Sequence, residues 1–157
     1  MTRLLALVAL LLGSSAARAQ PTPRPADVVS WRVMAHGGQR GAEAHVMFDA
    51  TVAPGWKMYA LDSAVGRPLV VGLDALPAGI TAGAPTQSAP TRARDAALGG
   101  EAATFAGIAR VIQPVRVART VAPGRHSVSG QVRYTVCNDQ ICLPPASAPF
   151  RVALAVR

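Results

Sequence analysis

Apolar and polar residues alternate along several segments of this chain. The clearest example is residues 44–52, where apolar side chains on one face alternate with polar side chains on the other. The apolar face holds Val46, Phe48, Ala50 and Val52, and the polar face holds His45, Asp49 and Thr51. Residues 29–33 and 150–156 repeat the alternation. A period of two is typical of β-strands that bury one face, so the pattern predicts strands in all three segments.

Turn-forming residues separate further candidate strands. These strands are residues 56–61, 69–73, 80–84, 105–117 and 127–136, with Pro/Gly turns at residues 53–55, 76–79 and 122–124. Strands at this spacing predict an all-β fold, an antiparallel β-sandwich of about eight strands over residues 28–157. Residues 37–41 are predicted to form a hairpin loop. Residues 89–101 are predicted to be a long loop or a short helical turn.

The N-terminus has the pattern of a secretory signal peptide, residues 1–19. Arg3 precedes an apolar run over residues 4–12, and small residues near Ala19 predict cleavage after that position. The run is shorter than the ~20 residues that span a bilayer, and no later segment is long enough. We therefore expect an exported, periplasmic protein that does not span the membrane. Residues 20–27 are expected to be an extended leader, because prolines recur there.

Charge and composition argue against nucleic-acid binding. The chain has 16 Lys+Arg and 8 Asp+Glu residues, a formal net charge of +8, but only 4 % of its residues are aromatic. The arginines are scattered singly, and few side chains could stack on bases. No phosphate-binding glycine motif is present, so no cofactor is predicted.

No metal is predicted either. His36, His45 and His126 are not spaced along the sequence as metal ligands usually are. A copper-delivery protein would need a cluster of methionines and histidines. The methionines beyond residue 1 are Met34, Met47 and Met58, and they are dispersed along the sequence.

The only two cysteines, Cys137 and Cys142, lie in the segment YTVCNDQICLPP. As a structural clip, a bridge between them would be worth about 2 kcal/mol, because a short ring restricts the unfolded chain little. Short and exposed disulfides tend to be labile. Asp139 disfavours a nearby thiolate and is expected to raise the pKa of both thiols, unless Arg133 reaches the loop. The residues alone leave two interpretations open: a redox centre, or a structural disulfide in an exported binding or scaffold module.

Three segments resemble one family. They are VRYTVCNDQICLPP, PGWKMYALD and DAALGGEAATFAGIARVIQPVRV. Each is similar to a segment of the exported N-terminal domain of the thiol:disulfide interchange protein (DsbD) family, and they occur in the family's order. The resemblance implies an immunoglobulin-like β-sandwich whose cysteines cycle between dithiol and disulfide. It also implies a link to cytochrome c biogenesis.

The resemblance assigns roles and partners. Cys142 would form the mixed disulfide with partners, and Cys137 would resolve it. Tyr59 and Trp56 would lie beside the pair, and residues 95–99, with Asp95 and Leu98, would form a loop that caps it. The implied electron donor is a thioredoxin-like reductase domain or a membrane thiol reductase, and the implied acceptors are periplasmic disulfide proteins.

Two features depart from the family pattern. The family's cap loop often carries an aromatic shield, whereas this chain has Ala96, Ala97 and Leu98 there. The sequence ends at Arg157 without transmembrane or thioredoxin-like parts, so the reductant is expected to be a separate protein.

Overall fold

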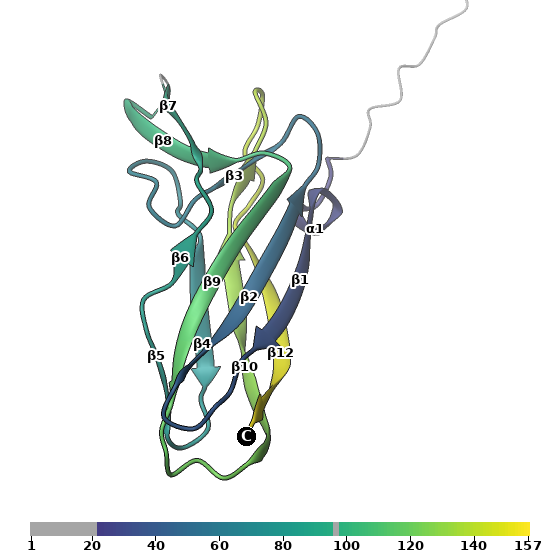
Figure 1. Ribbon diagram of the computed structural model, residues 1–157. Helices are drawn as coiled ribbons and strands as arrows, with labels where there is room; N and C mark the ends of the chain where they lie inside the picture. Colours follow the sequence, from purple (N-terminus) through teal and green to yellow (C-terminus); the bar gives the residue numbers. More distant parts are fainter. Residues whose placement is uncertain (1–21, 96–97) are drawn as a thin grey trace, which may run out of the picture.

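The computed structural model describes residues 22–95 and 98–157, which form a β-sandwich (Figure 1). In chain order its elements are α1 (Pro25–Val28), β1 (Val29–His36), β2 (Glu43–Val52), β3 (Lys57–Tyr59), β4 (Val70–Ala75), β5 (Ile80–Ala82), β6 (Thr86–Gln87), β7 (Thr91–Asp95), β8 (Gly100–Phe105), β9 (Ile108–Val117), β10 (Gly124–Tyr134), β11 (Val136–Cys137) and β12 (Ala146–Val156). The strand pairings in this part of the chain are antiparallel. The predicted all-β antiparallel sandwich is confirmed. The predicted signal peptide lies outside the described residues.

Three sheets build the sandwich. Their strand orders are β1-β2-β9-β5 with β6 also on β9, β12-β10-β4, and β11-β3-β8-β7. The alternating apolar residues of β2 and β9 meet those of β10 and β12 in one buried cluster, as the period of two predicts. Phe48 of β2 meets Phe150 of β12 edge-on, with ring centroids 4.8 Å apart. The third sheet adds Met58, Ala103, Phe105 and Val136 to the same buried cluster, so one core runs under all three sheets.

The leader differs from the prediction. Residues 25–28 form one helical turn, although the prolines were expected to keep residues 20–27 extended. Pro25 occupies the first turn, where a backbone N–H has no helical partner to lose, so proline is tolerated there. Arg24 and Asp27 bracket the turn, with Arg24 Nη2 2.9 Å from Asp27 Oδ1.

Residues 89–101 are also different from the prediction. In the described part of this range, β7 and the start of β8 pair as antiparallel strands, where a long loop or a helical turn was expected. The predicted strand over residues 105–117 is divided between β8 and β9 by Ala106 and Gly107. Gly107 has φ +74°, a left-handed conformation that suits glycine. The described residues therefore hold more strands than the eight or so expected.

The third sheet sets the position of the cysteines. Figure 1 shows β3, β7 and β8 at the end of the sandwich opposite the C-terminus. β11, which ends at Cys137, pairs with β3 and belongs to the same sheet. Within the described residues, no helix is long and apolar enough to cross a membrane.

Candidate functional site

Backbone hydrogen bonds close the hairpin that carries the cysteines. The Leu143 N–H donates to the Val136 carbonyl at 2.9 Å, and the Asn138 N–H donates to the Ile141 carbonyl at 2.9 Å. The side-chain oxygen of Asn138 also accepts from the Gln140 and Ile141 N–H groups, at 2.9 and 2.8 Å. An asparagine that binds the backbone two residues on is a common turn former. These bonds hold the hairpin without help from the cysteines.

Cys137 and Cys142 lie directly opposite each other across this hairpin and form a disulfide. Their Cα atoms are 4.0 Å apart and their sulfur atoms 2.03 Å apart. The flanking hydrogen bonds place them in a non-hydrogen-bonded pair, the position where opposed side chains are closest. Cys142 is exposed, whereas Cys137 is half-buried. Cys142 is therefore the more accessible residue of the two.

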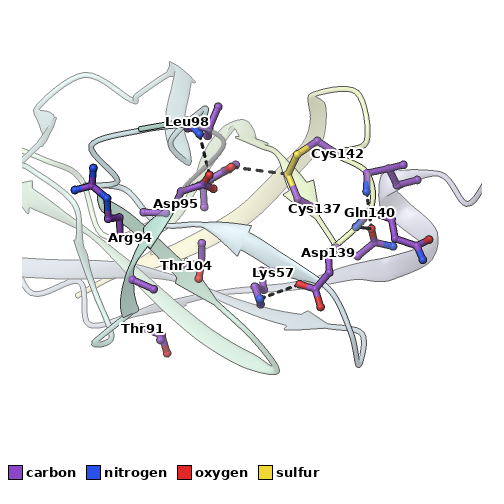
Figure 2. A pocket seen from close by; sticks show the side chains of 15 residues that line it. Lys57, Thr91, Arg94, Asp95, Leu98, Thr104, Cys137, Asp139, Gln140 and Cys142 are labelled. Atoms are coloured by element: carbon purple, nitrogen blue, oxygen red, sulfur yellow. Dashed lines mark hydrogen bonds and ion pairs between the residues drawn. A yellow bond between two sulfur atoms is a disulfide. The ribbon is translucent and has the colours of Figure 1, made fainter. Parts of the chain in front are cut away.

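A cleft of about 480 Å³ opens beside the disulfide (Figure 2). One face of the third sheet forms most of its floor, and Arg94 of β7 lines the cleft as well. β3 contributes Lys57 and Tyr59, β8 contributes Ala102 and Thr104, and β7 contributes Thr91, Ala93 and Asp95. The alanines and threonines have small side chains and so fill little of the cleft. The cysteine hairpin and Leu98 line the rest of it. Both cysteines thus border the cleft.

Tyr59 lies beside Cys137 as predicted from the resemblance. Its side chain is 6 % exposed, and its hydroxyl lies 3.9 Å from Cys137 Sγ. Because a disulfide sulfur carries no hydrogen, the hydroxyl is the donor in this long contact. Burial raises the pKa of Tyr59, and the negative charge of Asp95 raises it further. The phenol therefore stays neutral and able to donate at physiological pH.

Asp95 and Leu98 line the same cleft, on the side away from the cysteine hairpin. The Leu98 N–H donates to Asp95 Oδ1 at 2.9 Å, which closes a short turn. Leu98 is 49 % exposed. Ala96 and Ala97 of the expected cap lie outside the described residues.

The neighbour of Asp139 was not predicted. Lys57 Nζ lies 3.2 Å from Asp139 Oδ1, and both side chains are largely exposed (Figure 2). Lys57 is also the register partner of Cys137 across β3 and β11. Arg133 was considered as a counter-charge to Asp139. It lies on β10, opposite Ser147 of β12, and does not line the cleft.

Trp56 does not line the cleft. It precedes β3 and packs against the buried core, while Lys57 and Tyr59 face the cysteines. Side chains alternate along a strand, so the neighbour of Lys57 points the other way. Within the part of the chain that is described, no three His, Cys, Asp or Glu side chains form a group able to hold a metal ion.

Comparison with known proteins gives one family and one fold. The profile of the family described as "Thiol:disulfide interchange protein DsbD, N-terminal" matches residues 25–154. No curated protein matches the chain. The reduced DsbD N-terminal domain of Neisseria meningitidis is similar, with TM-score 0.57 and 20% identity over 85% of this chain and 90% of that chain.

Two further solved structures are similar. One is the complex between the DsbD N-terminal and PilB N-terminal domains of Neisseria meningitidis, with TM-score 0.52 and 18% identity over 85% of this chain and 88% of that chain. The other is the N-terminal periplasmic domain of ScsB from Proteus mirabilis, with TM-score 0.51 and 15% identity over 86% of this chain and 49% of that chain. At such identities the likeness shows the fold, and the immunoglobulin-like β-sandwich expected from the sequence is confirmed.

Proposed function

Because the chain belongs to the family of the N-terminal domain of the thiol:disulfide interchange protein DsbD, we propose that Cys137 and Cys142 carry electrons between partner proteins. The observation that supports this most directly is the unequal exposure of the two cysteines. Cys142 is exposed beside a cleft, and Cys137 is half-buried next to the Tyr59 hydroxyl. One sulfur is thus open to attack, and the other is sheltered.

The exchange proceeds in two thiol–disulfide steps. A partner thiolate attacks Cys142 Sγ, the disulfide breaks, and its bonding electrons leave with Cys137 as a thiolate. The partner's second thiolate then attacks the partner's first sulfur, which is bonded to Cys142 in the mixed disulfide, and Cys142 leaves as a thiolate. The partner dithiol is oxidised to a disulfide, and the Cys137–Cys142 pair gains two electrons and the two protons. The reverse steps reduce a downstream disulfide.

The donor in this proposal is a thioredoxin-like reductase domain or a membrane thiol reductase, and the acceptors are periplasmic disulfide proteins, including those of cytochrome c biogenesis. The solved complex of a DsbD N-terminal domain with a PilB N-terminal domain supports a protein partner of this kind. The periplasmic ScsB domain supports the same location for this chain after cleavage near Ala19. Mass spectrometry of exported protein tests that location, since an intact Met1 would contradict it.

Reactivity of the two single-cysteine variants tests the assignment of roles. The probe is a thioredoxin with one active-site cysteine, activated as its mixed disulfide with thionitrobenzoate. Cys137→Ser keeps the exposed thiol and should form the protein–protein disulfide roughly tenfold faster than Cys142→Ser, because access limits exchange. Equal rates would contradict the proposed order of attack.

The alternative is a structural disulfide in a binding or scaffold module. Titration of the wild-type pair against glutathione or thioredoxin separates the two functions. A carrier should have a reduction potential within the range of thioredoxin-like proteins, whereas a value well below about −300 mV is typical of structural disulfides and would overturn the proposal.

A further inference from the structure

Sheet pairing brings together methionines and histidines that are far apart in sequence. In the register of β1 with β2, Met34 lies opposite Met47, and His36 lies opposite His45. Met34 and His36 are two residues apart on β1, as are His45 and Met47 on β2, so all four belong to one face. Directly opposed residues have Cβ atoms about 4.5–5.5 Å apart, within reach of a shared ligand.

This face points away from the core. On β2, the residues that alternate with His45 and Met47 are fully buried, as Val46 and Phe48 show. On β1, Val33 and Ala35 pack against the same core. Of the four Met and His side chains, His36 is exposed and the other three are half-buried. The two thioethers and two imidazoles therefore lie on the outer face, where an ion from solvent can reach them.

Glu43 already holds one of these histidines. Its Oε1 lies 3.0 Å from His45 Nε2, so that nitrogen carries the shared proton when the imidazole is neutral. The lone pair of His45 then resides on Nδ1. A carboxylate that fixes the tautomer of a histidine is the usual outer partner of a metal-binding imidazole. The hydrogen bond to Glu43 thus leaves Nδ1 of His45 free to bind an ion.

We propose that Met34, Met47, His36 and His45 form a Cu(I) site on the outer face of β1 and β2. Thioether sulfur is a soft ligand that favours Cu(I), while imidazole binds copper as well as harder metals. Zn²⁺ would use only the two imidazoles, since thioethers are poor ligands for it. No thiol is required, so the site is separate from the disulfide.

The two sites lie at different ends of the fold. In Figure 1, β1 runs from α1 toward the end of the sandwich that holds the C-terminus, and His36 is its last residue. The cysteine hairpin lies at the opposite end, with β3, β7 and β8. Copper binding therefore does not depend on the proposed thiol–disulfide exchange.

Competition for Cu(I) tests the site. The protein would be the Cys137→Ser/Cys142→Ser variant, so that no thiolate can take the ion, and Cu(I) would be offered anaerobically as its coloured bicinchoninate complex. We expect one equivalent to transfer to this variant. Met34→Leu and Met47→Leu should each weaken binding by at least roughly tenfold, and loss of both should abolish the transfer.

Two further variants separate a built site from general surface affinity. Glu43→Gln should weaken Cu(I) binding by about ten- to hundredfold, as loss of an outer carboxylate partner does in known metal sites. His126→Gln is the matched control, because His126 lies on β10 with its Nε2 2.7 Å from the Ala122 carbonyl, and it should leave the affinity unchanged. Absence of transfer, or equal transfer to the double Met→Leu variant, would overturn the assignment. Zn²⁺ binding that exceeds Cu(I) binding would overturn it too.

Discussion

Reduction of the Cys137–Cys142 disulfide should weaken the fold only slightly. In the chain-entropy model, a bridge that closes so short a ring contributes about 2 kcal/mol to the free energy of unfolding. The native hairpin loses little more, because the backbone bonds from Leu143 to Val136 and from Asn138 to Ile141 remain. We therefore expect the reduced protein to keep its β-sheet circular dichroism and to unfold at a somewhat lower urea concentration.

The same magnitude fixes a second measurable quantity. The oxidised and reduced forms, each folded or unfolded, make a closed thermodynamic cycle. The difference in unfolding free energy between the oxidised and reduced protein must therefore equal the difference in reduction free energy of the cysteine pair between the folded and the unfolded chain. For a two-electron couple 30 mV corresponds to about 1.4 kcal/mol, so about 2 kcal/mol corresponds to roughly 45 mV. The folded pair should be harder to reduce than the same pair in the urea-unfolded chain by that amount.

Urea titrations with and without dithiothreitol give the stability difference, and redox titrations of the folded and urea-unfolded protein give the potential difference. The Cys137→Ala/Cys142→Ala variant is the control, and it should unfold like the reduced wild type. A loss near 5 kcal/mol, the upper end for native disulfides, would refute this reasoning, since the bridge would then be a main support of the fold.

Three other substitutions test contacts at and near the cleft. Lys57→Met should raise the pKa of the free Cys137 thiol and Asp139→Asn should lower it, because the variants remove opposite charges from one ion pair. Alkylation rates of Cys137 measured against pH in the Cys142→Ser background test this. Shifts of the same sign in both variants would indicate that the Lys57–Asp139 ion pair has only a structural role. Ser63→Ala should cost about 1–3 kcal/mol in urea unfolding, because the buried Ser63 hydroxyl accepts from the Ala103 N–H at 3.0 Å, and an unchanged midpoint would contradict that contact.

The sequence predicted the sandwich well because the core strands alternate strictly. Residues 44–52 bury every second side chain, as their pattern indicated. The hairpin of β7 and β8 was missed because β7 has no buried residue and thus no apolar alternation to recognise. β7 forms a strand because it pairs with β8, which in turn pairs with β3. Tertiary pairing, rather than local propensity, decides such a segment.

The sites show the same limit. The resemblance led to the cysteines, Tyr59 and Leu98, which do share a cleft. Lys57 was missed because its closeness to Asp139 comes from the pairing of β3 with β11, about 80 residues apart along the chain. Met34 and Met47 were judged dispersed for the same reason, although they are opposed in the sheet. Strand register cannot be read from the spacing of residues within a sequence.

The alternation of strand faces explains how this fold can carry chemistry at little cost to its core. Val136 and Leu143 are buried on either side of the hairpin, so they anchor it at its base while the cysteines between them remain outside the core. Opening the disulfide then changes the surface that a partner meets rather than the packing beneath it. A carrier needs this property, because it must be recognised differently in its two redox states and remain folded in both. For the proposed carrier function, the burial of Val136 and Leu143 therefore matters more than the bridge.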